Sequence, residues 1–432
     1  MERLSVQALD AEGRGVARDA SGRVVFVEGA LAGELVETEF LRTRRRHALA
    51  RARAVLVPSA GRREPRCAHF GRCGGCAMQH ADARTQMAAK QRWLEDCLAR
   101  IGRVHPETIL AIVYGPEWGY RRKARLAVRW VEKKGGALVG FHERHSSYVA
   151  EMRGCEVLAP GISELIVPLR ELVGRLSARV RLPQIEVAAA ENAAALVFRL
   201  LDPLGAEDAA CLRAFARERG VAVWVQPGGP ESAQPFEPVD PPPLHYDLPE
   251  FDVRICFRPT DFTQINFAVN RVLVARAVRL LDPQPGERVA DLYCGLGNFS
   301  LPLARAGATV LGLEANAALV ARARANARAN GLEVRFEQAD LARGALERYG
   351  RFEKLLLDPP REGAVALVNS LPDAWPARIV YVSCDPATLA RDANVLVHVK
   401  GFRLAAAGVV NMFPHTAHVE SICLFERAAA GR

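Results

Sequence analysis

The chain has 432 residues, of which half are hydrophobic and a quarter charged, and its formal net charge is +9. This length predicts two or three domains, and the positive charge favours a polyanionic partner. Ten cysteines are too few for a disulfide scaffold, no apolar run approaches a membrane span, and the first residues predict no signal peptide. We therefore expect a cytoplasmic protein rather than a secreted or membrane-bound one.

Residues 1–57 read as several short strands separated by turns, which predicts a small β-barrel. Its cations gather near the end of this region, as Arg42, Arg44, Arg45, Arg46, Arg51 and Arg53. Alternation through part of this run would place several guanidinium groups on one face, where they would suit phosphates. The alternative interpretation is a solvated charged surface.

Cys67, Cys73 and Cys76 lie within ten residues, and two glycines separate the last pair. A site with four ligands needs one more, and Cys155 is the best candidate. Tetrahedral zinc and a [4Fe–4S] cluster both accept four thiolates. Zinc ribbons commonly pair two Cys-x2-Cys knuckles, and this chain has one, so the pattern favours iron–sulfur. The spacing is not Cys-x3-Cys-x2-Cys, which indicates a structural cluster rather than radical chemistry.

The next segments predict a mixed α+β domain that reaches about residue 257. Ala81–Ile101 has helical composition, and we expect this helix to pack on the C-terminal domain. Tyr120–Arg129 starts a strand rich in cations, which is a second candidate for phosphate contact. The proline-rich segment Gln226–Pro249 predicts an irregular connector and no helix.

From Arg258 the pattern changes to alternating strands and helices, which predicts a doubly wound parallel sheet. The expected helices are Ala268–Leu280 and Phe299–Ala306, and the expected strands are Arg288–Tyr293, Thr309–Leu313, a strand near Val334, Lys354–Leu357 and Ile379–Val382.

Several strands of this sheet end in residues suited to a nucleoside cofactor. The first ends in Asp291-x-x-Cys-Gly-x-Gly-Asn, whose glycines allow close backbone approach. Glu314 ends the second strand, where it would accept hydrogen bonds from ribose hydroxyls, and Asp340 follows the third, near an adenine amine. Asp358-Pro-Pro ends the fourth. A glycine loop with one distant acid also suits dinucleotides, but the whole series favours methyl transfer over hydride transfer.

Cys384 stands between the strand expected at Ile379–Val382 and a helix that starts near Pro386. A small buried core residue is the alternative interpretation of such a cysteine. Uracil C5 is too weak a nucleophile to accept a methyl group unaided, whereas a thiolate added at C6 makes C5 carbanion-like. A base must then remove the C5 proton. Glu420 supplies an acid near the C-terminus, and His415 and His418 are other candidate bases.

These motifs together resemble the RNA uridine-C5 methyltransferase family, through residues 259–266, 291–298, 358–361, 383–386 and 418–421. The resemblance implies Cys384 as nucleophile and Glu420 as the proton-abstracting base. It implies S-adenosylmethionine contacts from Gln264, Tyr293, Asn298, Glu314, Asp340 and Asp358. It also implies a [4Fe–4S] cluster on Cys67, Cys73, Cys76 and Cys155.

The implied architecture is an α/β, Rossmann-like methyltransferase domain over 258–432. An OB-like TRAM barrel would span 1–57, and a central α+β iron–sulfur domain 58–257. A branch of the family that carries both appendages, the barrel and the cluster, methylates the 23S ribosomal RNA uridine conventionally numbered 1939. We therefore expect 23S rRNA as the partner and expect no binding to DNA or to a membrane. We also expect the protein to be a monomer. A related two-site 23S enzyme carries both appendages, and another rRNA or tRNA uridine stays open. Amine methylation of a nucleobase and a non-catalytic iron–sulfur RNA-binding module are rival functions.

Overall fold

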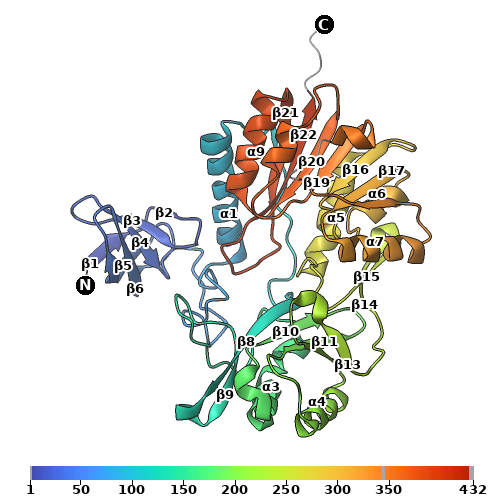
Figure 1. Ribbon diagram of the computed structural model, residues 1–432. Helices are drawn as coiled ribbons and strands as arrows, with labels where there is room; N and C mark the ends of the chain where they lie inside the picture. Colours follow the sequence, from blue (N-terminus) through green and yellow to red (C-terminus); the bar gives the residue numbers. More distant parts are fainter. Residues whose placement is uncertain (1, 342–345, 428–432) are drawn as a thin grey trace.

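The computed structural model describes residues 2–341 and 346–427. Three parts follow one another along the chain, and Figure 1 shows the N-terminal part set to one side of the other two. Within the described residues, no helix combines the length and the apolarity needed to cross a bilayer.

The N-terminal domain is a six-stranded sheet in the order β1-β5-β6-β4-β3-β2. Its strands are β1 (Glu2–Ser5), β2 (Ala8–Leu9), β3 (Gly15–Arg18), β4 (Val24–Glu28), β5 (Leu35–Thr43) and β6 (His47–Val57). Val25, Val27, Ala48 and Ala50 are buried, as alternation in a half-buried strand requires.

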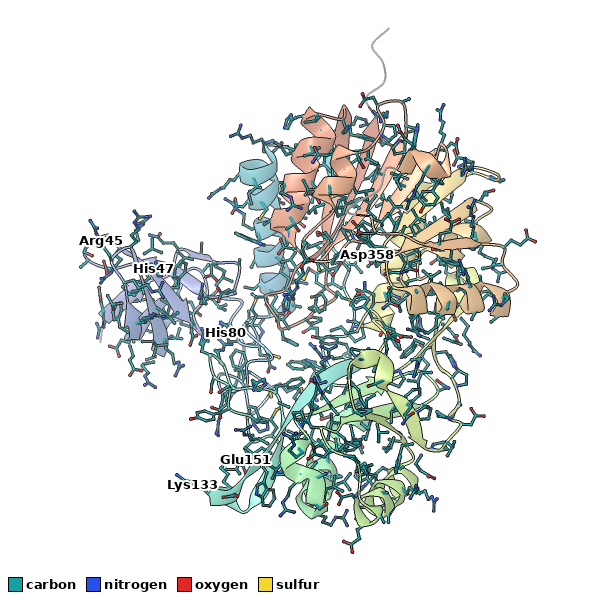
Figure 2. The ribbon with its side chains drawn as sticks, viewed as in Figure 1. Arg45, His47, His80, Lys133, Glu151 and Asp358 are labelled. Atoms are coloured by element: carbon teal, nitrogen blue, oxygen red, sulfur yellow. The ribbon has the colours of Figure 1, made fainter. Side chains whose placement is uncertain are left out.

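The arginine run of this domain does not form one face. Arg44, Arg45 and Arg46 are exposed in the turn between β5 and β6, where strand alternation does not apply. Arg51 pairs with Glu28 at 3.3 Å, and Arg53 pairs with Glu39. Figure 2 shows Arg45 on this domain, away from the rest of the chain. A cluster of exposed arginines therefore stands at the tip of the β5–β6 hairpin.

The central domain is a second six-stranded sheet, in the order β13-β12-β11-β10-β8-β9. One face, which includes Leu196 and Phe198, packs with its helices in one core, while Ala195 and Val197 on the other face join the core of the C-terminal domain. Its elements are β8 (Lys123–Val131), β9 (Gly136–Gly140), α2 (Pro160–Ser163), α3 (Ile166–Arg175), β10 (Gln184–Ala189), β11 (Ala194–Arg199), α4 (Ala206–Arg219), β12 (Ala222–Gln226) and β13 (Gln234–Glu237).

Two sequence-based expectations for the central part need correction. The segment 226–249, predicted to be irregular, contains β13 and β14 (Leu244–Leu248). Pro235 is tolerated in β13 because this is an edge strand, where a missing donor costs little. The cationic strand is also less available to phosphates than expected, since Lys123 lies 3.2 Å from Glu186, which also attracts Arg125.

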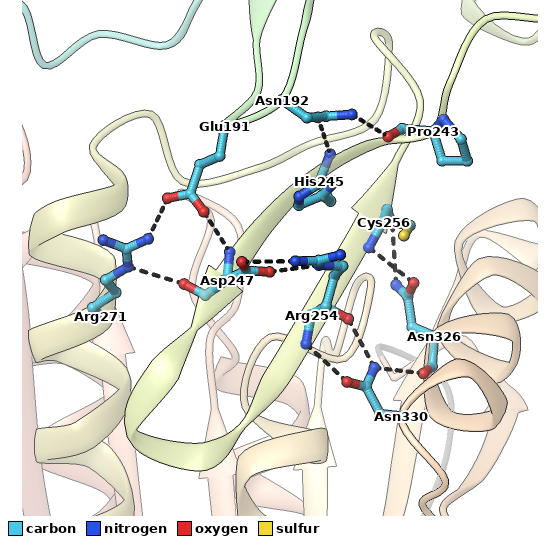
Figure 3. A network of polar contacts seen from close by, with 10 residues as sticks. All are labelled: Glu191, Asn192, Pro243, His245, Asp247, Arg254, Cys256, Arg271, Asn326 and Asn330. Atoms are coloured by element: carbon cyan, nitrogen blue, oxygen red, sulfur yellow. Dashed lines mark hydrogen bonds and ion pairs between the residues drawn. The ribbon is translucent and has the colours of Figure 1, made fainter.

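The hairpin of β14 and β15 (Val253–Phe257) joins the central and C-terminal domains, as Figure 3 shows. Arg254 forms two hydrogen bonds with Asp247 across the hairpin, at 2.8 and 3.1 Å. Asn326 of α7 (Ala317–Ala329) and Asn330, which caps that helix, bond to the backbone of Cys256 and Arg254 at 2.8–3.1 Å. The hairpin is therefore fixed to a helix of the C-terminal domain.

The C-terminal sheet has the strand order β18-β17-β16-β19-β20-β22-β21-β7. Strands β16 to β20 are parallel, but β22 inserts antiparallel between β20 and β21, so the sheet is not parallel throughout. Its elements are α5 (Phe267–Leu281), β16 (Arg288–Leu292), α6 (Ser300–Arg305), β17 (Thr309–Glu314), α7, β18 (Arg335–Gln338), β19 (Lys354–Leu357), α8 (Val365–Asn369), β20 (Arg378–Ser383), α9 (Pro386–His398), β21 (Phe402–Val410) and β22 (Glu420–Arg427).

Two elements from the first third of the chain pack on this domain. Helix α1 (Ala83–Cys97) lies beside α9 in Figure 1, and its Met87 and Leu94 are fully buried in the C-terminal core. Strand β7 (Thr108–Ile109) pairs with the outer edge of β21. Packing therefore assigns these two elements to the C-terminal sheet, although the sequence places them before the central one.

Candidate active site

Cys384 lies in the connection between β20 and α9, at the carboxyl edge of the sheet, and is partly exposed. Asp385 caps α9, because its carboxylate accepts hydrogen bonds from the backbone N–H groups of Ala387 at 2.9 Å and Thr388 at 3.0 Å. The Oγ of Ser383 accepts from the Asp385 N–H at 3.1 Å. The backbone on the C-terminal side of the thiol is thereby held rigid.

Glu420 begins β22, and strand register brings it beside Cys384. Strands β20 and β22 are antiparallel with Ser383 opposite Ser421, so the next positions along each strand are neighbours. The Oγ of Ser421 also donates to the Ser383 carbonyl at 3.1 Å. Glu420 is only 2% exposed. A carboxyl group and a thiol 36 residues apart in the sequence thus meet at one sheet edge.

Burial raises the pKa of the Cys384 thiol to about 11, and the carboxylates of Glu420 and Asp358 act in the same direction. Arg361 opposes them, because its cation favours the thiolate. Burial also holds the pKa of Glu420 well above its usual range, with a further contribution from Asp358. Arg361 lies 3.4 Å from the Nδ1 of His418. Sequence reasoning gave Arg361 no role, although it directly follows Asp358-Pro-Pro.

Three acidic residues, Asp291, Glu314 and Asp358, lie at or next to the carboxyl ends of β16, β17 and β19. Asp291 is fully buried, and its Oδ2 accepts from Ser300 at 2.5 Å. Its Oδ1 has no hydrogen-bond partner among the residues that the structure describes. Burial, together with the nearby Asp358 and Glu314 carboxylates, raises the pKa of Asp291 to about 7, and the Ser300 hydrogen bond opposes them. Burial likewise raises the pKa of Asp358 to about 7.

Two of the other predicted cofactor residues already form hydrogen bonds within the protein. Glu314 accepts a hydrogen bond from the Gly295 N–H at 3.2 Å and thereby shapes the glycine loop. The amide of Asn298 bonds to Asn270 and to the Tyr246 hydroxyl, at 2.9–3.0 Å. Further predicted residues are Gln264, which is buried in the loop before α5, Tyr293, which has a positive φ of 67°, and Asp340, which is exposed after β18.

This edge fits S-adenosylmethionine, whose sulfonium and ammonium groups are cations. A buried carboxylate oxygen needs a hydrogen-bond donor or a positive charge beside it, because a buried acceptor without a hydrogen bond costs about 1–3 kcal/mol. Asp291 offers such an oxygen, and Asp358 and Glu314 add negative charge around it. The glycine loop between β16 and α6 supplies the close backbone approach.

The four predicted metal ligands line one cavity of about 210 Å³, which we call the cysteine cavity. Cys73, Cys76 and Cys155 are at most 9% exposed. Burial raises the pKa of Cys76 to about 12 and that of Cys155 to about 11. Among the described residues, no group of three or more histidine, cysteine or acidic side chains is placed to hold a single metal ion. A [4Fe–4S] cluster binds its thiolates through different irons and does not need the ligand geometry of a single ion.

The C-terminal part of the chain matches a protein-family model, that of the tRNA (Uracil-5-)-methyltransferases, over residues 251–428. A protein of Thiobacillus denitrificans named 23S rRNA (uracil(1939)-C(5))-methyltransferase RlmD is 62% identical over 98% of this chain and 99% of its own length. The protein of the same name from Nitrosospira multiformis is 58% identical over 98% of both chains. The chain belongs to the RlmD family.

Membership of the RlmD family confirms the resemblance drawn from the sequence motifs, including the branch that the two appendages indicated. The fold agrees. The crystal structure of Pyrococcus abyssi tRNA (uracil-54, C5)-methyltransferase in complex with S-adenosyl-L-homocysteine superposes with a TM-score of 0.75, at 23% identity, over 98% of this chain and 99% of that one. The α/β methyltransferase fold preceded by a β-rich N-terminal domain is thereby established.

Proposed function

We propose that the protein transfers a methyl group from S-adenosylmethionine to C5 of a uridine in 23S ribosomal RNA, the position numbered 1939 in its relatives' names. The observation that carries the proposal is that Glu420 lies close enough to Cys384 to raise its pKa, at the edge where Asp291 and Asp358 suit the cofactor. C5 methylation through a covalent adduct requires a nucleophile that reaches C6 and a base that reaches the C5 proton of the same ring.

In the proposed reaction, the Cys384 thiolate adds to C6 of the uracil, and the ring electrons move to C5. When bound, S-adenosylmethionine would supply the electrophilic methyl group: C5 attacks it, the S–CH3 bond breaks, and S-adenosylhomocysteine leaves with the bonding electrons. Glu420 then takes the C5 proton, the C5–C6 double bond re-forms, and the C6–S bond breaks to return the thiolate. Arg361 favours the thiolate electrostatically, and Asp358 would accept a hydrogen bond from the uracil or the cofactor.

The target uridine must leave its stack to reach Cys384, which costs a few kcal/mol and less in a loop than in a duplex. We propose that the N-terminal domain holds the flanking RNA by its phosphates, through the exposed cations at the tip of the β5–β6 hairpin. Phosphate contacts of this kind position the RNA without reading its sequence.

Replacing Arg44, Arg45 and Arg46 by Ala should weaken rRNA binding and flatten its salt dependence. Each lost phosphate contact reduces the slope of log affinity against log salt by about 0.7–0.9, so three contacts reduce it by about 2 to 3. Filter binding between low and physiological salt measures this slope. The matched control replaces Arg181, Arg217 and Arg219 of the central domain, which form ion pairs there. Equal slopes for the two triple variants would contradict the role of the hairpin tip.

We further propose that Cys67, Cys73, Cys76 and Cys155 hold a [4Fe–4S] cluster with a structural role. Protein purified without oxygen should contain about four iron atoms per chain and show broad visible absorbance. Cys76→Ala and Cys155→Ala should lose both signals, whereas Cys211→Ala, outside the cysteine cavity, should keep them. Stoichiometric zinc, or the absence of iron, would contradict the cluster.

A further inference from the structure

The loop 411–419 connects β21 to β22 and leads directly into Glu420. Three successive carbonyls of this loop accept hydrogen bonds from three different parts of the chain. Lys90 of α1 donates to the Phe413 carbonyl at 2.9 Å, and the Tyr120 hydroxyl donates to that of Pro414 at 2.9 Å. The backbone N–H groups of Ala77 and Met78 both donate to the His415 carbonyl at 2.9 Å.

His415 is fixed by its side chain as well as by its backbone. Its φ is 65°, a left-handed conformation that a residue with a Cβ adopts at a cost. The side-chain amide of Gln86 accepts from the His415 N–H at 2.8 Å and lies 3.1 Å from its Nδ1. The Trp118 ring stacks on the imidazole with centroids 3.8 Å apart. A strained residue fixed from three sides indicates a loop whose path is determined by its surroundings.

The residues that hold the loop are deeply buried polar groups. Gln86 is 1% exposed and Lys90 is 3% exposed. Burying an ammonium group without a counter-charge is costly, so an apolar side chain would be the cheaper choice at either position if packing alone mattered. All of these contacts come from residues 77–120, outside the strands that carry Cys384 and Glu420. Stability of the C-terminal sheet alone does not explain them.

We propose that Gln86 and Lys90 are positioning residues, which hold loop 411–419 so that the Glu420 carboxylate faces the C5 proton of the uracil adduct. Neither side chain touches the substrate. They act through the Phe413 and His415 backbone, and Glu420 follows this loop with no intervening element. The inference rests on the proposed covalent reaction, because it assigns a supporting role in the step that ends it.

Gln86→Leu and Lys90→Met should slow the release of methylated RNA from the covalent adduct by about 10- to 100-fold, the effect expected when a catalytic group moves by up to 1 Å. The adduct is measured on denaturing gels after rapid mixing of enzyme, S-adenosylmethionine and unmodified 23S rRNA fragment. In RNA carrying 5-fluorouridine there is no C5 proton to remove. Adduct formation on that RNA reports Cys384 and methyl transfer without Glu420, and it should keep its wild-type rate.

Gln91→Leu is the matched control for Gln86→Leu, because Gln91 lies on the same helix and bonds within it, to Glu95 at 2.9 Å. Lys90→Met should stay folded, because replacing a buried cation by an apolar side chain of similar length is often neutral or stabilising. Wild-type release rates in both variants would overturn the proposal, as would equal slowing of adduct formation and release. If the wild-type enzyme formed no adduct on either RNA, the covalent reaction itself would be wrong, which is a separate result.

Discussion

Cys384→Ala is expected to lower the rate of uracil C5 methylation by about 10⁴-fold or more, because no other group would activate C5. The cofactor edge lies on β16, β17 and β19 and does not depend on the thiol. Binding of S-adenosylmethionine should therefore stay within about twofold of the wild-type affinity. Transfer of a labelled methyl group to unmodified 23S rRNA measures the first quantity, and calorimetry measures the second.

The control for this variant is Cys256→Ala, which removes a partly buried thiol from the β14–β15 hairpin and should leave turnover unchanged. Retained turnover in Cys384→Ala would exclude the covalent route. It would favour direct methylation of a nucleobase amine held by Asp358-Pro-Pro, and mapping the methyl group on the product would then show nitrogen in place of C5. Loss of cofactor binding in the same variant would indicate a folding defect instead.

Glu420→Gln is expected to trap the enzyme on its RNA after methyl transfer. The amide keeps the size of the side chain but cannot accept the C5 proton, so the C6–S bond persists. Turnover should fall by about 10²- to 10⁴-fold, the range that a general base contributes. A band of protein-linked RNA that carries the labelled methyl group should accumulate on denaturing gels, near one adduct per enzyme.

Glu426→Gln, at the other end of β22, provides a matched change of charge and should release product at the wild-type rate. Normal release by Glu420→Gln would contradict the assignment and transfer the role of base to His418, which is exposed beside Arg361. His415 is a poor candidate, since its ring is stacked on Trp118 and bonded to Gln86.

Much of the C-terminal fold was predictable, because its strands are continuous apolar runs bounded by turn residues. The strand expected at Thr309–Leu313 is β17 and extends by one residue, and the helix expected at Ala268–Leu280 is α5, longer by one residue at each end. Buried parallel strands appear in the sequence as continuous apolar runs, because both faces of the sheet are covered. The pattern of apolar runs therefore suffices to place the motif residues at the carboxyl ends of these strands on one edge of the sheet.

The adjacency of Cys384 and Glu420 was not predictable in the same way. It depends on β22 running antiparallel between β20 and β21, a pairing that no local pattern in residues 420–427 specifies. The burial of Gln86 was also not predictable, because a glutamine in a helix is usually a surface residue. Strand register determines the first feature and tertiary burial the second. Each depends on contacts between residues that lie far apart in the chain.

The packing of α1 on the C-terminal sheet has a consequence for synthesis on the ribosome. Lys90 and its acceptor Asn411 are 321 residues apart, so α1 leaves the exit tunnel long before its partners exist. At about 5–20 residues per second, its apolar side, with Met87 and Leu94, stays uncovered for roughly 15 to 60 s. During that interval the nascent chain presents the apolar side of α1 to chaperones, and the first third of the protein completes its folding only when the last strands emerge.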